Sequence, residues 1–490
     1  MNPRSLSFLI LFPVLITLPI LLLAASTARF AASLPMVPAG LILAYSSARL
    51  AAMASSSSHR ILAITFWIFV YIFLAVAPFL QIATQNFPWP GYYNDTLLVK
   101  SCFIVITGLI AFEFGQYLIP ARHAIFVPSV LNRSINSSII PILGVIALAS
   151  SPYLLSRSGG AEMLFMPRSI RNQLLMSEFD IPAMMLLTHG LSTPIYVLSV
   201  AALVVWIARH TRGQRTAWLW KAMTIMMLGA TLVLNNPIST ARFKVGTILL
   251  SILFVLPWRR WSSAAAISGT VFGLLFLFPF ADLFRNTLDT NLSTRLAQTS
   301  VISELTENGD YDAFQMITNA TMVLEQSGTD FQLGRQISGA LFFWVPRAIW
   351  QNKPIATGEW IAERKGYGFA NLSAPLWAEL FIDGGWLLLM IGFMGYGYLV
   401  RVVDRWHAIS HNSGQARVVS ILIPVYAGYQ FFLLRGSLMP ALAYLTPIVL
   451  VALLCGVHAS RGRSKVSDHQ QRGTAPLSSL RSSMGHSSGH

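Results

Sequence analysis

The feature that most constrains this chain is a series of apolar segments, each close to twenty residues long and nearly free of charged side chains. A helix needs about 20 apolar residues to cross the hydrocarbon core of a bilayer. Soluble domains carry about 25% charged residues, whereas only 11% of these 490 residues are charged and 54% are hydrophobic. We therefore expect an all-α, polytopic membrane protein rather than a soluble enzyme or a disulfide scaffold.

These segments predict a bundle of about 12 transmembrane helices. The predicted spans are residues 6–25, 31–50, 61–83, 97–119, 139–155, 182–208, 217–234, 237–256, 263–281, 384–400, 418–434 and 438–457. A single transmembrane domain is expected over residues 1–460. Residues 461–490 are rich in Ser and Gly and are expected to form a disordered cytoplasmic tail.

The distribution of charge gives an orientation. Basic residues concentrate in the loops on the cytoplasmic side of membrane proteins. With the N-terminus inside, most Lys and Arg residues fall on the inner side, whereas nearly all acidic residues fall on the outer side. Both termini are then cytoplasmic. The net charge of +15 is explained by this topology and does not indicate a nucleic-acid partner.

One link is much longer than the others and lies on the outer side, over residues 282–383. Its segment 337–350 is apolar but too short to span a bilayer, and Pro346 interrupts it. We expect this segment to lie in the membrane interface, with Arg347 at the depth of lipid phosphates and Lys353 shortly after it.

Three more outer cations lie at the ends of predicted spans: Arg242, Lys244 and Arg435. An arginine next to apolar helices is costly unless it is paired. We therefore expect these cations, with Arg347 and Lys353, to form a pocket for a polyanion at the membrane surface. Simple snorkelling of the side chains to the interface is the alternative.

Carboxylates in the long loop come in close sets. Asp310 and Asp312 flank a tyrosine in a turn-like Asn-Gly-Asp-Tyr-Asp sequence. Glu379 and Asp383 are four residues apart and share a face of a predicted helix that leads into the tenth span. Carboxylates at these positions are candidates for a general base, and a solvated helix face is the alternative. The sequence has no P-loop, dinucleotide fingerprint or metal-ligand spacing, so no cofactor and no metal are expected.

Several motifs in this half of the chain resemble those of the bacterial O-antigen and exopolysaccharide repeat-unit polymerases, the Wzy-type oligosaccharide polymerases. The motifs are NGDYDAFQ (308–315), LGRQ (333–336), VPRAIWQNKP (345–354) and SAPLWAELFIDGG (373–385), with NNP…RF (235–243) and LLRG (433–436) beside them. The resemblance covers about residues 230–440.

The resemblance implies a glycosyltransferase of the bacterial inner membrane that works at its periplasmic face. Such an enzyme transfers a growing glycan from undecaprenyl pyrophosphate onto one incoming lipid-linked repeat unit, without nucleotide sugar or metal. We assign diphosphate binding to Arg242, Arg347 and Arg435, with Lys353 and Lys244 as lesser candidates. Glu379 is the first choice for the base, followed by Asp312 and Asp310. The expected partners are the undecaprenyl-pyrophosphate-linked oligosaccharide, membrane lipid and a chain-length regulator protein.

Other functions remain open at this stage. An O-antigen ligase shares the long outer loop and the lipid donor, but ligases usually carry a histidine in that loop and residues 282–383 contain none. A transporter or flippase of lipid-linked oligosaccharide would bind near the membrane midplane and often shows internal repeats. Glycosyltransferases that use dolichol-phosphate sugars carry acidic residues in the first outer loop, and this chain has none there.

Overall fold

The computed structural model describes residues 3–25, 32–56, 60–118, 127–157, 160–167, 170–171, 173–174, 190, 192–257, 262–278, 300–326 and 330–457. Throughout these ranges the regular secondary structure is helical, and the only β-type pairing is two isolated bridges. The expectation of an all-α protein is therefore confirmed for this part of the chain. The predicted tail 461–490 and the start of the long loop, 282–299, lie outside the described residues.

Eight helical segments among the described residues are long and apolar enough to cross a membrane. Six are single helices: α1 (Pro3–Ala24), α2 (Met36–Ala54), α5 (Asp95–Tyr117), α6 (Ile139–Arg157), α9 (Ser192–Thr211) and α20 (Val418–Arg435). The other two are the continuous helical segment Ile61–Thr84 and the long helix α19 (Leu376–Ser413). This composition supports a membrane-embedded protein.

Four further predicted spans correspond to shorter helices. They are α10 (Trp218–Leu234), α11 (Arg242–Val255), α12 (Ser262–Phe272) with the π-helix η4 (Gly273–Leu277), and α21 (Leu438–Leu454). Each of the twelve predicted spans thus overlaps a helix, but among the described residues only eight segments are long and apolar enough to cross by themselves. The number of twelve spans stays a prediction.

The segment Ile61–Thr84 is buried along its whole length. It consists of α3 (Ile61–Phe69), a π-helical stretch η1 (Val70–Val76) and α4 (Ala77–Thr84). π-Helical turns inside α-helices are rare and frequently occur at functional sites. Both η1 and η4 contribute residues to the cavity described below.

α3, α5 and α19 pack around a set of buried aromatic rings. Phe66 of α3 stacks on Phe112 of α5 with ring centroids 3.6 Å apart. In α19, the rings of Trp377 and Phe393 lie 4.2 Å apart, and the Trp377 indole donates to the Val105 carbonyl at 3.2 Å. These contacts fix the first turns of α19 against α5.

α19 is kinked near its start. Gly384 and Gly385 leave helical geometry, and Gly385 has a φ of 58° and a ψ of −148°. Only glycine adopts this conformation without strain. The kink separates the first two turns of α19, which carry Glu379 and Asp383, from the long apolar part of the helix.

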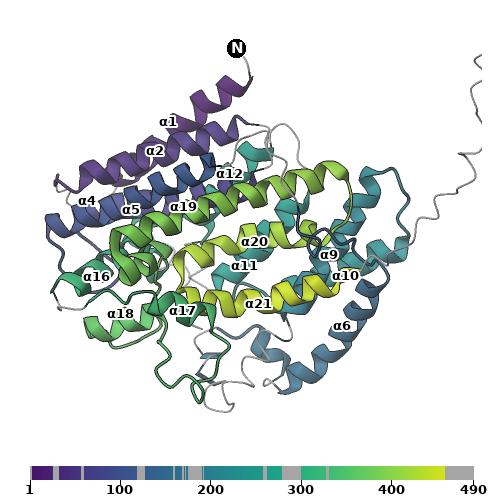
Figure 1. Cartoon of the computed structure of the whole chain (residues 1–490). Helices are drawn as coiled ribbons and strands as arrows, with labels where there is room; N and C mark the ends of the chain where they lie inside the picture. Colours follow the sequence, from purple (N-terminus) through teal and green to yellow (C-terminus); the bar gives the residue numbers. More distant parts are fainter. Residues whose placement is uncertain are drawn as a thin grey trace, which may run out of the picture. The chain divides into compact units, whose positions relative to one another are not determined.

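The described part of the long loop is itself helical. It contains α15 (Val301–Glu307), the 3-10 turn η5 (Gly309–Tyr311), α16 (Ala313–Gln326), α17 (Arg335–Leu341) and α18 (Thr357–Lys365). In Figure 1, α16, α17 and α18 lie together at one end of α19, α20 and α21. Elsewhere, Ser134 pairs with Arg417 and Ile135 pairs with Gly456, so two links predicted on the inner side meet each other and the inner end of the last predicted span.

Candidate functional site: an arginine-lined cavity

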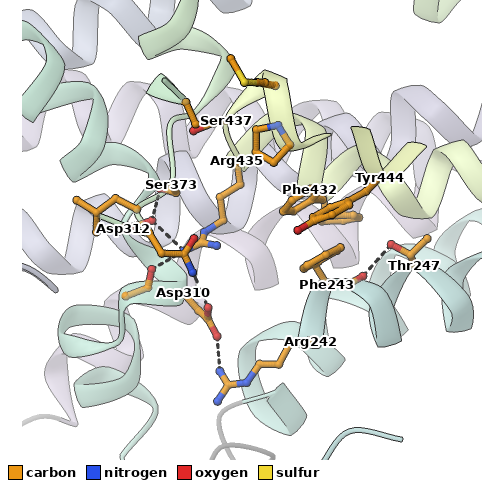
Figure 2. Close-up of a pocket in the computed structure, with 18 of the residues that line it drawn as sticks. Arg242, Phe243, Thr247, Asp310, Asp312, Ser373, Phe432, Arg435, Ser437 and Tyr444 are labelled. Carbon is orange, nitrogen blue, oxygen red and sulfur yellow. Dashed lines mark hydrogen bonds and ion pairs between the residues drawn. The ribbon is translucent and has the colours of Figure 1, made fainter. Parts of the chain in front are cut away.

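A cavity of about 1230 Å³ lies where α11, α20 and α21 meet the segment 308–312 and the links 343–356 and 370–373. Three of the five predicted cations, Arg242, Arg347 and Arg435, line it. Two of the three predicted carboxylates, Asp310 and Asp312, line it as well. Arg242 and Arg435, which are more than 190 positions apart in the chain, are thus brought to one site (Figure 2).

Arg242 is the first residue of α11 and is only 6% exposed. Its Nη1 donates to Oδ2 of Asp310 at 2.7 Å and lies 3.6 Å from Oε1 of Glu304. A cation at a helix N-terminus opposes the helix dipole, and a buried charge needs a partner. The two carboxylates supply the compensation that keeps Arg242 at this position.

Arg435 is the last residue of α20, where a cation is favoured by the helix dipole. Its Nη2 donates to the Gly309 carbonyl and, at 3.0 Å, to Oδ1 of Asp312. Its Nε is buried and has no acceptor among the described residues. Because a guanidinium carries five N–H donors, Arg435 keeps donors for a ligand.

Asp310 and Asp312 have different environments although only one residue separates them. Tyr311 between them is fully buried, and its hydroxyl donates to the Leu274 carbonyl of η4 at 2.6 Å. Burial raises the pKa of Tyr311, so the phenol stays protonated. Its inward position leaves both neighbouring carboxylates lining the cavity.

The carboxylate of Asp312 is buried and already accepts hydrogen bonds from three protein side chains. Its side chain is 1% exposed and accepts from Trp89 Nε1 at 2.8 Å, from Ser373 Oγ at 2.6 Å and from Arg435. The Asp310 side chain is 27% exposed. Asp310 is therefore the carboxylate of this pair that a ligand can reach.

Arg347 lies on the link between α17 and α18. Its Nη1 donates to the Lys353 carbonyl at 2.8 Å, and the side chain is exposed. Lys353 does not line the cavity, and its Nζ donates to the carbonyls of Phe343 and Val345. Partial burial, followed by the charge of Arg347, lowers the pKa of Lys353. Lys353 therefore shapes the link that carries Arg347.

Lys244 lies away from the cavity. Its Nζ donates to the hydroxyl of Ser192, the first residue of α9, and it is not among the lining residues. The structure thus brings together the three arginines but neither of the two lysines that the sequence suggested.

Glu379 is also not among the lining residues and is buried, with 1% exposure. Its two oxygens accept from Thr357 Oγ1 at 2.6 Å and from the Leu438 N–H at 2.8 Å. Asp383, one turn later, accepts from the N–H groups of Gln336 and Ile337 at 3.0 and 2.7 Å. The shared face predicted for the two carboxylates is not solvated, because it holds the first residues of α17, α18 and α21.

The apolar wall of the cavity was not found from the sequence. The ring of Phe243 in α11 stacks on that of Phe432 in α20, with ring centroids 3.9 Å apart, and the ring centroids of Phe432 and of Tyr444 in α21 lie 5.9 Å apart (Figure 2). On each helix the lining residues follow a spacing of three or four: 243, 246, 247 and 250 on α11; 428, 431, 432 and 435 on α20; 440, 443, 444 and 447 on α21. This helical periodicity does not distinguish a cavity wall from a packed core in sequence alone.

The charged lining of the described cavity is formally balanced. Three arginines face Asp310, Asp312 and Glu359. The cavity therefore does not attract anions through a large net charge. It offers oriented N–H donors next to an apolar wall. Carboxylates hold Arg242 and Arg435, and backbone carbonyls hold Arg347.

Comparison of the chain with protein-family models, with curated proteins and with solved structures finds no match.

Proposed function

We propose that this protein is a membrane glycosyltransferase that polymerises undecaprenyl-pyrophosphate-linked oligosaccharide repeat units. The observation that carries the proposal is the single cavity lined by Arg242, Arg347 and Arg435. The same three arginines are those that the sequence predicts to bind the diphosphate.

The proposed reaction needs little beyond electrostatics. A hydroxyl of the acceptor sugar attacks the anomeric carbon of the donor, the bond from that carbon to the diphosphate oxygen breaks, and the hydroxyl proton passes to a base. Negative charge develops on the departing diphosphate. Guanidinium groups preorganised around it stabilise this charge, and one such contact is worth about 3–4 kcal/mol.

Asp310 is our candidate for the base. Its carboxylate is accessible in the cavity and lies 2.7 Å from Arg242, which keeps it near the proposed diphosphate site. Asp312 already accepts three hydrogen bonds, so we assign it to the placement of Arg435. We assign Glu379, which does not line the cavity, to the placement of the surrounding helices.

The apolar wall supports a lipid-linked substrate. Lining residues extend over seven positions on each of α11, α20 and α21, which corresponds to about 10 Å along a helix. A polyprenyl chain attached to a diphosphate needs such an apolar path next to its charged group.

The contacts between links support the proposed topology. Trp89, Asp310 and Arg435 lie in links on the outer side in the arrangement of twelve spans, and Arg242 lies near the outer end of its span. The β-bridged residues described above all fall in inner links or at the inner end of the last span. We therefore keep the periplasmic position of the long loop and the cytoplasmic position of both termini as part of the proposal.

The test is turnover of the purified protein with its native lipid-linked repeat unit, isolated from a deletion strain. Arg435→Gln and Arg347→Gln should each lower the rate by a hundredfold or more. Arg335→Gln is the matched control, because Arg335 lies on the same loop, donates to the Asn352 carbonyl and does not line the cavity. Normal turnover in both cavity variants would refute the assignment.

The deletion strain itself separates the alternatives. Loss of a polymerase leaves products capped with a single repeat unit. Loss of an O-antigen ligase strands full-length polymer on the carrier lipid, and loss of a flippase leaves no repeat units on the outer side. Either of the last two results would replace the proposed activity.

A further inference from the structure

Trp89, in the link between α4 and α5, lines the cavity beside Asp312. Its backbone N–H donates to Oε1 of Gln315 at 2.9 Å, and its carbonyl accepts from Nε2 of the same side chain at 2.6 Å. The indole N–H donates to Asp312 at 2.8 Å. Backbone and side chain are therefore both fixed to the segment that carries the cavity carboxylates.

The indole of Trp89 packs directly against the backbone of Gly309 and leaves no room there for a side chain. A β-carbon at Gly309 would lie 2.4 Å from Cζ2 of Trp89, so any other residue there would displace the ring. The ring of Phe369 also packs on the indole, with the two ring centroids 4.7 Å apart and an angle of 58° between the ring planes. Phe369 is 45% exposed; it does not itself line the cavity, but the next two residues, Ala370 and Asn371, do. The two rings therefore form an aromatic corner at the edge of the cavity.

Two further polar side chains also line the cavity. Asn371, two residues after Phe369, is exposed and lines the cavity, as does Glu359 of α18. Within the described part of the chain, neither side chain makes a hydrogen bond to another residue. An amide and a carboxylate together offer both donors and acceptors to a ligand.

An aromatic face beside free amide and carboxylate groups fits a sugar. The C–H bonds on one face of a pyranose ring are apolar and slightly positive, and they pack on the negative face of an aromatic ring. The hydroxyl groups around the rim of the sugar need hydrogen-bond partners, because burying a hydroxyl without one is costly.

We propose that Trp89 and Phe369 form the binding subsite for the sugar residue adjacent to the diphosphate, with Asn371 and Glu359 as partners for its hydroxyl groups. The inference rests on the proposed function. Asp312 fixes the relative position of the two sites, because one of its oxygens accepts from Arg435 and the other from Trp89. The sugar subsite therefore lies directly beside the diphosphate site.

The experiment compares the affinity of the purified protein for two lipids. Undecaprenyl diphosphate reports the diphosphate and tail sites alone, and the native lipid-linked repeat unit adds the sugars. Trp89→Leu also removes the hydrogen bond to Asp312, which places Arg435, so its effects on the two lipids are compared with each other. It should weaken binding of the repeat unit roughly three- to tenfold more than binding of undecaprenyl diphosphate. Phe369→Leu should act in the same direction. Tyr92→Leu is the control, because Tyr92 is in the same link, is 87% exposed and does not line the cavity.

Trp89→Phe separates stacking from positioning, since it keeps an aromatic ring but loses the hydrogen bond to Asp312. It should retain most of the difference in affinity between the repeat unit and undecaprenyl diphosphate. Equal losses for both lipids in Trp89→Leu and Trp89→Phe would show that Trp89 only positions Asp312, and the subsite would be wrong. Unchanged binding of both lipids in Trp89→Leu and Phe369→Leu would also overturn it. Wild-type protein that binds neither lipid would refute the proposed function itself.

Discussion

Glu379 provides the sharpest test of how this site is built, because the sequence suggests a base and the structure suggests a clamp. Its carboxylate joins Thr357, at the start of α18, to Leu438, at the start of α21. The link with Arg347 ends just before α18, and Arg435 lies just before α21. Glu379 therefore holds together the two links that carry two of the cavity arginines.

The magnitude follows from the two lost hydrogen bonds. Glu379→Ala leaves the Thr357 hydroxyl and the Leu438 N–H buried without their acceptor, and each unsatisfied group costs about 1–3 kcal/mol. We expect a total loss of about 2–6 kcal/mol in the free energy of unfolding. Glu379→Gln keeps the shape and one acceptor oxygen, so its cost should be about 1 kcal/mol or less.

The assay is thermal unfolding of the purified protein in lipid nanodiscs, with turnover measured on the same samples. Glu379→Ala should lower the unfolding temperature, whereas Glu379→Gln should keep both stability and most of the turnover. Glu363→Ala is the control, since Glu363 is an exposed carboxylate on α18. A Glu379→Gln variant with wild-type stability and a hundredfold lower turnover would refute the clamp and restore Glu379 as the base.

Three further predictions concern the backbone kink, the η5 turn and the absence of metal. Gly385→Ala forces an L-residue into a φ of 58° with a ψ of −148° and should destabilise the protein by about 1–3 kcal/mol. Gly395→Ala is the control, because a β-carbon there meets open space, and its unfolding temperature should be the higher of the two. Tyr311→Phe removes the hydrogen bond to the Leu274 carbonyl and should cost about 1 kcal/mol in the same assay. EDTA should leave turnover by the wild-type protein unchanged, and a loss restored by added divalent cation would contradict the expectation that no metal takes part.

The positions of the long apolar helices could be predicted from the sequence alone. Long apolar segments must satisfy their backbone hydrogen bonds internally in a lipid environment, and a single helix does this without reference to the rest of the chain. All twelve predicted segments overlap helices for this reason. Which of the shorter helices, such as α11, cross the membrane depends on tilt and on neighbouring helices, so their number was not determined by composition.

The sequence also selected the three arginines of the cavity but could not rank the carboxylates. Arg242 and Arg435 stand out because arginines at the ends of apolar helices are expensive without a partner. Arg347 stands out because it lies in a short apolar segment of the long loop. The carboxylates at 310, 312 and 379 look equivalent in sequence, and their different exposure depends on partners supplied by distant segments.

Only the tertiary structure decided that Asp310 faces the cavity, that Glu379 joins two helix N-termini and that Trp89 belongs to the site at all. Trp89 and Asp312 are separated by more than 200 residues, and no local pattern encodes their hydrogen bond. Helix formation depends on neighbouring residues, whereas a cavity exists only where several helices pack imperfectly against one another. Its lining is therefore a property of the packed chain, and the sequence of any one segment does not contain it.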